Sequence, residues 1–176
     1  MDSAEYEGKI ASRFAAFDQD GSGYIDREDF SGAAAALLAE FGTTARSDKG
    51  QALYSGAEAF WQGMAGIADV DGDQRVSRQE FVTGAVKRLR DNPERFAEIA
   101  RPFLSAAIAV AGGAGAASGD GRTVTPAAAE RALRVLGVEP EAAARVAREL
   151  DADGDGRIGE AEVLKGFAAY YVTPEP

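Results

Sequence analysis

Side chains that carry oxygen recur with one spacing in three twelve-residue segments of the chain, residues 18–29, 69–80 and 151–162. In each segment, positions 1, 3 and 5 carry a carboxylate or a hydroxyl, position 8 is apolar, and position 12 is Asp or Glu. Carboxylates crowded in this way repel one another unless a cation lies between them. A hard divalent cation such as Ca²⁺ takes about six to eight oxygen ligands. The spacing therefore predicts three divalent-cation sites, and calcium is the expected ion.

The pattern resembles the calcium loop of the EF-hand, in which ligands come from alternate positions. Positions 1, 3, 5 and 12 give side-chain oxygens, position 7 gives its backbone carbonyl, and position 9 often acts through a water. The predicted side-chain ligands are Asp18, Asp20, Ser22, Asp26 and Asp29, then Asp69, Asp71, Asp73 and Glu80, and finally Asp151, Asp153, Asp155 and Glu162. The predicted carbonyl ligands belong to Tyr24, Arg75 and Arg157. A single loop of this type also occurs as an Asp/Gly turn or in dockerin-like repeats, but three copies between helical patterns favour EF-hands.

Position 6 separates the second loop from the others. The backbone turns sharply there, and glycine, present as Gly23 and Gly156, reaches a positive φ without penalty. Gln74 occupies this position in the second loop. A left-handed non-glycine residue costs roughly 1–2 kcal/mol. We expect the second loop to bind its ion more weakly than its three aspartates alone would suggest.

Position 12 separates the first loop from the others. Glu80 and Glu162 are long enough to give both oxygens to the ion, whereas Asp29 is one methylene shorter. Fewer ligands favour Mg²⁺, which takes six at shorter distances. The first loop is therefore a candidate for mixed calcium and magnesium occupancy. The alternative is that the loop contracts and compensates for the shorter side chain.

A fourth loop, residues 117–128, keeps the frame of the pattern but not its ligands. Positions 1, 3, 5 and 12 are Ala117, Gly119, Gly121 and Ala128. We expect no metal there. Its apolar position 8, Val124, should pair with Ile158 in a short antiparallel bridge, because EF-hand loops come in pairs. Thr125 and Pro126 predict a helix start immediately afterwards.

Composition excludes several other functions. The chain has 176 residues, a net charge of −10, and neither cysteine nor histidine. Disulfides, Cys/His zinc sites and Cys- or Ser-His catalysis are therefore excluded or disfavoured. The acidic balance argues against nucleic acids and anionic membranes as partners. No secretory signal is visible at the N-terminus, and the weakly polar run 103–117 is too short to span a membrane. We expect a cytoplasmic monomer, and the abundant arginine and alanine suggest a bacterial genome.

Helical periodicity predicts an all-α fold of eight helices, one on each side of every loop. The expected spans are 4–17, 28–41, a long helix ending before residue 69, 80–89, a helix from 93 to about 112, 126–136, 141–150, and a final helix after 160. We interpret the aromatic residues as core. The first two loops start further apart than the last two, so longer helices or an ordered linker must fill the gap.

Length and loop spacing resemble the sarcoplasmic calcium-binding proteins and their bacterial relatives, the calerythrins. The resemblance implies four EF-hand units in two pairs, residues 1–90 and 91–176, packed into one compact globule with short β-bridges between paired loops. It also implies a calcium buffer or signal modulator that binds about three Ca²⁺. Methionine usually lines the adaptable groove of a sensor, and this chain has only 2. The alternative is a sensor that opens an apolar groove for an unidentified target protein. Catalysis is not expected, because the clustered carboxylates lie in closed ion loops.

Overall fold

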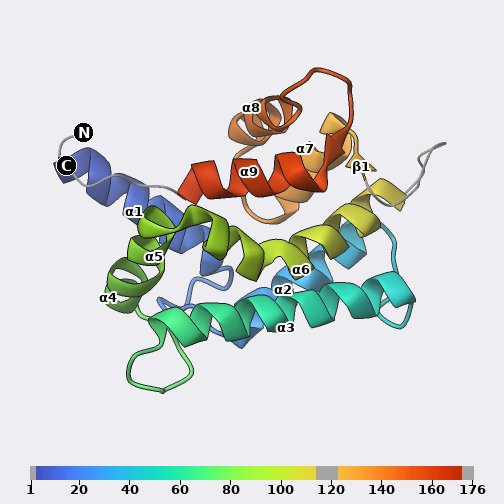
Figure 1. Cartoon of the computed structure of the whole chain (residues 1–176). Coiled ribbons are helices and arrows are strands. Elements are labelled where there is room, and N and C mark those ends of the chain that lie inside the picture. The colour runs from blue at the N-terminus through green and yellow to red at the C-terminus, as the bar shows by residue number, and fades with distance from the viewer. Residues whose placement is uncertain (1–2, 114–122, 172–176) are drawn as a thin grey trace.

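The computed structural model describes residues 3–113 and 123–171 of the chain, and within them nearly all regular structure is helical (Figure 1). The helices are α1 (Ser3–Phe17), α2 (Arg27–Glu40), α3 (Asp48–Ala68), α4 (Arg78–Glu80), the π-helical turn η1 (Phe81–Val86), α5 (Lys87–Asp91), α6 (Pro93–Gly113), α7 (Pro126–Val135), α8 (Pro140–Leu150) and α9 (Glu160–Tyr171). Two short strands, β1 (Thr123–Val124) and β2 (Ile158–Gly159), complete the order. The all-α prediction is confirmed.

Capping side chains set the starts of α2, α4, α6 and α7. Asp26 caps α2 and Ser77 caps α4, each in a capping box with the residue three positions later. Thr125 caps α7 through the N–H of Ala128, with proline next in the chain. Asn92 accepts a hydrogen bond from the backbone N–H of Arg95 at the start of α6. Because these polar side chains satisfy N–H groups that have no partner within the helix, the observed starts lie within one or two residues of the predicted ones.

The helix that leaves the second loop is not a uniform α-helix, which the sequence did not predict. Its middle section, η1, has the wider π-helical turn. Gly84 lies in this section, where a Cβ would come within 2.6 Å of the carbonyl oxygen of Ile67. The close approach of two backbones therefore coincides with the π-helical turn.

Two long helices, α3 and α6, pack along each other, with α3 at the lower edge of the view in Figure 1. The length of α3 accounts for the wide spacing of the first two loops. Gly56 lets the helices approach closely, since a Cβ there would lie 2.6 Å from the carbonyl oxygen of Pro102 and 2.7 Å from Cα of Phe103. Helix α9 packs on α6 and covers it from the other side.

Aromatic side chains fill the space between these helices. Phe60 on α3 makes ring contacts at centroid distances from 4.9 to 6.2 Å with rings of α1, α2, α6 and α9. The buried aromatic residues are Phe14, Phe17, Phe30, Phe41, Phe60, Trp61, Phe81, Phe96 and Phe103. On α6, Phe96, Phe103 and Ile108 are all buried. The interpretation of the aromatic residues as core is confirmed for phenylalanine and tryptophan, whereas Tyr24 is exposed. Among the described residues, none of the helices combines the length and the apolar character that a membrane span needs.

Short antiparallel bridges join the loops in pairs, as the sequence predicts. The N–H of Ile25 donates to the carbonyl of Val76 at 2.9 Å, and the reverse bond is 2.7 Å. Val124 pairs with Ile158 in the sheet formed by β1 and β2. All four side chains are buried. The fourth loop thus keeps its structural partner although its ligand positions are lost.

Polar contacts add to the packing between the first and second halves of the chain. Arg131 on α7 donates to Oε1 of Glu40 at 3.1 Å, and its guanidinium lies 4.7 Å from the ring centroid of Phe41. Gln19, in the first loop, donates to the carbonyl of Leu136 at 3.0 Å. The expected compact arrangement of two loop pairs is confirmed.

The contact at Gly56 predicts a stability effect. In Gly56→Ala the new methyl meets backbone atoms that cannot move aside, so we expect the free energy of unfolding to fall by about 1–3 kcal/mol. Gly66 lies on the same helix, and a Cβ added there would have nothing within 4 Å. Gly66→Ala is therefore the matched control and should stabilise by about 0.5–1 kcal/mol. Urea unfolding of both variants checks this, and equal effects would contradict the packing argument.

Candidate metal centres

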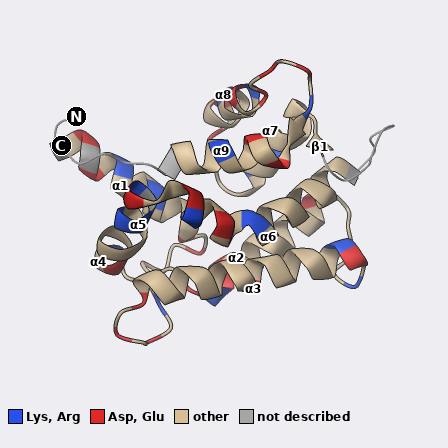
Figure 2. Ribbon diagram, in the orientation of Figure 1, with Lys and Arg blue, Asp and Glu red and all other residues tan. Residues whose placement is uncertain are grey.

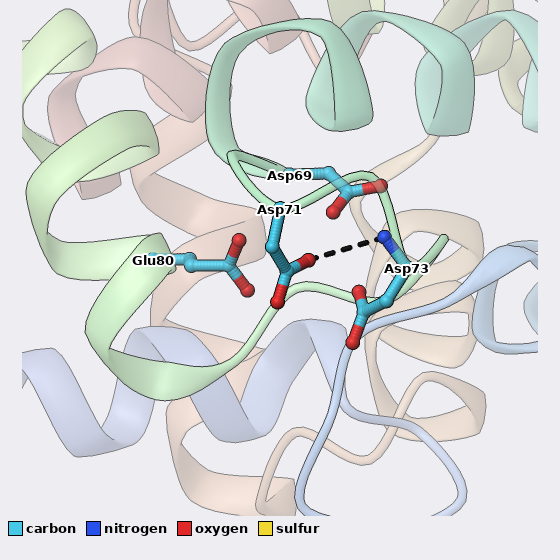
Figure 3. Close-up of side chains that lie close together, drawn as sticks. All are labelled: Asp69, Asp71, Asp73 and Glu80. Atoms are coloured by element: carbon cyan, nitrogen blue, oxygen red, sulfur yellow. Dashed lines mark hydrogen bonds between the residues drawn. The ribbon is translucent and has the colours of Figure 1, made fainter.

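Carboxylates from each of the three predicted loops gather in space. One oxygen from each member lies within 4.8 Å of the others in three sets: Asp18, Asp20 and Asp29; Asp69, Asp71, Asp73 and Glu80; and Asp151, Asp153 and Glu162. Figure 3 shows the second set, in which four side chains from the loop and from α4 point toward a common space. The loops therefore bring together residues that the sequence could only place by spacing.

All three loops contain the same backbone-to-side-chain hydrogen bond between positions 6 and 1. One carboxylate oxygen of position 1 accepts a bond from the backbone N–H of position 6. The distances are 2.9 Å from Gly23 to Asp18, 3.0 Å from Gln74 to Asp69, and 2.9 Å from Gly156 to Asp151. Position 6 has a positive φ in every case, including 64° at Gln74. The predicted left-handed glutamine is confirmed.

The glutamate at position 12 ties the two ends of its loop together. Glu80 accepts from the N–H of Val70 at 2.8 Å and from that of Ser77 at 3.1 Å. Glu162 accepts in the same way from Ala152 at 2.9 Å and Gly159 at 3.3 Å. Burial acts to raise the pKa of Glu80, but the N–H groups of Ser77 and Val70 bring it below its usual value. An ionised Glu80 suits a cation ligand.

Asp29 closes the first loop differently because its side chain is shorter. Its two oxygens accept from the N–H of Asp20 at 3.1 Å and of Asp26 at 2.9 Å, so it reaches position 3 rather than position 2. Its side chain is only 2% exposed. Burial raises the pKa of Asp29 to about 7, against the lowering effect of these two hydrogen bonds. A cation in the first loop would therefore compete with a proton near neutral pH.

Positions 5 and 7 are also joined within each loop. Ser22 donates through its hydroxyl to the carbonyl of Tyr24 at 3.0 Å. The N–H of Arg75 donates to Asp73 at 3.0 Å, and that of Arg157 to Asp155 at 2.8 Å. These bonds hold the position-5 oxygen beside the position-7 peptide. The position-7 residues of the first two loops also touch, with the Arg75 guanidinium 4.3 Å from the ring centroid of Tyr24.

The chemistry of the three clusters fits a hard divalent cation. Every side-chain atom that could bind the cation is an oxygen, and most of these oxygens belong to carboxylates. In the last loop Oδ1 of Asp151 is buried, and no hydrogen-bond donor reaches it within the described residues. A buried carboxylate oxygen without a donor is costly, and a cation at position 1 would remove that cost. Asp151 therefore has the free, buried oxygen that a metal ligand requires.

Two details differ from the sequence-based ligand set. Asp155 lies outside the closely spaced set of the last loop, where Asp151, Asp153 and Glu162 meet. Glu28, which the sequence did not single out, lies close to Asp20 and Asp26. In the sequence, Glu28 is marked only by its position two residues after the helix cap Asp26. In the fourth loop Val124 and Ala128 are described, whereas positions 117–122 lie outside the described residues.

The φ of 64° at Gln74 leads to a prediction. Gln74→Gly removes a side chain from a left-handed residue, so the calcium-loaded protein should gain about 1 kcal/mol in free energy of unfolding. Gln74→Ala keeps the Cβ and is the matched control. Urea unfolding in excess calcium measures both. A glycine variant no more stable than the alanine variant would contradict the strain.

Comparison with known proteins agrees with this geometry. The sequence model of the EF-hand domain pair matches residues 7–86. A calcium-binding protein of Streptomyces coelicolor, studied as a basis for prokaryotic calcium-mediated regulation, is 61% identical with a TM-score of 0.89. The alignment covers 97% of this chain and 99% of that protein. The predicted bacterial origin agrees with this match.

More distant structures share the fold. Calcium-loaded apo-aequorin from Aequorea victoria has 15% identity and a TM-score of 0.71, with 99% of this chain and 94% of that chain covered. A sarcoplasmic calcium-binding protein from amphioxus has 19% identity and a TM-score of 0.63, with 96% and 90% covered. The comparison with curated proteins found no match. With its paired loops and its close Streptomyces relative, the chain belongs to the EF-hand family of calcium-binding proteins.

Proposed function

We propose that the chain binds about three Ca²⁺ and acts as a calcium buffer or signal modulator. The ions would occupy loops 18–29, 69–80 and 151–162. Positions 1, 3, 5 and 12 would supply side-chain oxygens, position 7 its carbonyl, and Asp26 a water-mediated contact. The observation that carries the proposal is the gathering of carboxylate oxygens within 4.8 Å in each of these loops.

Electrostatics gives the proposed mechanism. The carboxylates of an empty loop repel one another, and a divalent cation neutralises that repulsion. Because each position-12 side chain bonds both ends of its loop, ion binding would also order the helices on either side. At calcium concentrations 100 times the dissociation constant, each site would add about 2.7 kcal/mol to stability. Binding would thus couple calcium uptake to the order of the whole fold.

The closed core supports a buffer or modulator over a sensor that opens. Met64, the methionine within the described residues, is fully buried. The aromatic rings around Phe60 contact one another across several helices, and separating them would expose a large apolar area. We propose that the two loop pairs, 1–90 and 91–176, stay packed together in a monomer. We also place this role in the cytoplasm, and we expect no catalytic activity.

Magnesium occupancy of the first loop belongs to the same proposal. Asp29 would give fewer oxygens than a glutamate, and burial raises the pKa of its carboxyl to about 7, so that a proton competes with the ion. Both effects should weaken calcium binding there relative to the last loop. The loop would then carry Mg²⁺ when calcium is scarce.

A sensor that engages a target protein is the second candidate function. It is favoured by the Streptomyces relative, whose structure is described in terms of calcium-mediated regulation. Regulation needs a partner that responds to the calcium-loaded form. This candidate differs from the first in requiring new exposed apolar surface on calcium binding.

Fluorescence of a dye that binds apolar surface, followed during calcium titration in millimolar magnesium, separates the two candidates. For a buffer or modulator we expect the signal to fall or stay flat, because ion binding closes the protein around its core. A rise at saturation would contradict that role and support the sensor.

Removing one strong ligand should remove one site. In Glu162→Gln, the loss of a negative charge and of one strong oxygen should weaken calcium binding at the last loop while the other sites remain. Isothermal calorimetry should then count one fewer strong site, with about 2.7 kcal/mol less calcium-dependent stabilisation at 100 times the dissociation constant. Glu141→Gln, on the exposed side of α8, is the matched control. Unchanged stoichiometry in Glu162→Gln would contradict the assignment.

A further inference from the structure

An open groove of about 650 Å³ lies between the end of α3, the η1–α5 segment and the start of α6. It is separate from the interior of the ion loops, although Val70 of the second loop forms part of its wall. Its lining combines two chemistries, apolar side chains and basic ones. The proposed calcium sites do not account for either.

Several apolar side chains line the groove. Val70 is 81% exposed, by far the more exposed of the two large apolar side chains that stand out at the described surface. Ile67 and Ile99 also line the groove and are partly buried, and Phe96 is a buried residue of the same lining. Single exposed apolar residues are common, but a cluster in a groove indicates a surface that a partner covers.

The basic part has the opposite sign to the molecule. Lys87 and Arg88 from α5 and Arg95 from α6 line the groove and are exposed. No described residue forms an ion pair with any of them, whereas the net charge of the chain is −10. Figure 2 shows basic residues on α5 and on α6, where acidic residues also lie. Asp91, the acidic residue of the lining, pairs with Arg90 at 3.6 Å.

We propose that this groove binds an acidic amphipathic segment of another protein. Apolar side chains of the segment would cover Val70 and Ile99, and its Asp or Glu residues would pair with Lys87, Arg88 and Arg95. Recognition of a helix by a groove works through such apolar anchors, and the flanking charges set the choice of partner. An anionic membrane is disfavoured as the occupant, because the acidic surface of the rest of the molecule would be repelled by it.

The groove is joined to the second ion loop through one residue. The N–H of Val70 donates to Oε2 of Glu80 at 2.8 Å, and Val70 follows Asp69 in the loop. On the proposed function, an ion that engages Glu80 and Asp69 fixes Val70 from both sides. Occupancy of the loop and of the groove should therefore be linked, and the linkage must be reciprocal.

The test uses fluorescence anisotropy with a labelled helical peptide of about 16 residues, carrying leucines at i, i+3 and i+7, a few glutamates beside them and alanines elsewhere. The calcium-loaded full chain should bind it saturably, and added salt should weaken binding. The triple variant Lys87→Glu, Arg88→Glu and Arg95→Glu should bind at least tenfold more weakly, and Val70→Ser severalfold. Arg145→Glu, an exposed reversal on α8, is the control and should bind normally.

Three results would overturn the proposal. The first is a lysine-for-glutamate version of the peptide that binds as well as the original. The second is a triple variant that matches the Arg145→Glu control. The third is a groove occupied instead by a second copy of the chain, seen as Val70-dependent dimerisation in sedimentation, or by phosphatidylserine vesicles.

Calcium calorimetry on the same samples separates this proposal from the proposed function. Normal calcium uptake without peptide binding would reject the groove alone. Peptide binding without calcium uptake would reject the calcium role alone. Equal peptide affinity in calcium and in EDTA, with calcium uptake intact, would contradict the link through Val70.

Discussion

The hydrogen bonds that the carboxylate at position 12 accepts are the interactions on which the structure of each loop and its two helices depends. In all three loops it accepts a bond from the N–H of position 9, where the exiting helix begins, and another from near the start of the loop. One side chain therefore helps to start a helix, closes a loop and offers the oxygens of an ion site. Any change in its charge or position, by a cation or by a proton, must act on both helices at once.

The helices on either side of each loop cannot move independently of the other helices. Buried bridges join the loops in pairs, and α3 packs along α6 through a contact that only glycine allows at Gly56. Arg131 and Gln19 add polar contacts between the halves. We therefore expect ion binding to make this packed structure more compact rather than to open it. A partner protein would then bind a surface that is already exposed, such as the groove lined by Lys87, Arg88 and Arg95.

The sequence was sufficient for features set by local chemistry. The alternation of Asp residues placed the loops, Gln74 at position 6 predicted a positive φ, and Val124 at position 8 predicted its pairing with Ile158. Features that depend on contacts between residues far apart in the chain could not be predicted from the sequence. The π-helical turn at Gly84 and the close approach at Gly56 depend on which helices meet, and the burial of Asp29 depends on the core beneath it. The groove likewise joins residues from three separate helical segments.

Counting the bound ions is the most direct test of the account. Native mass spectrometry of the whole chain, titrated with calcium, resolves each bound ion as a separate mass. We expect the series to end at three calcium ions per chain, because three loops keep carboxylates or hydroxyls at positions 1, 3, 5 and 12 and the fourth does not. A series that ends at one ion, or that reaches four at the same concentrations, would contradict the assignment of the loops.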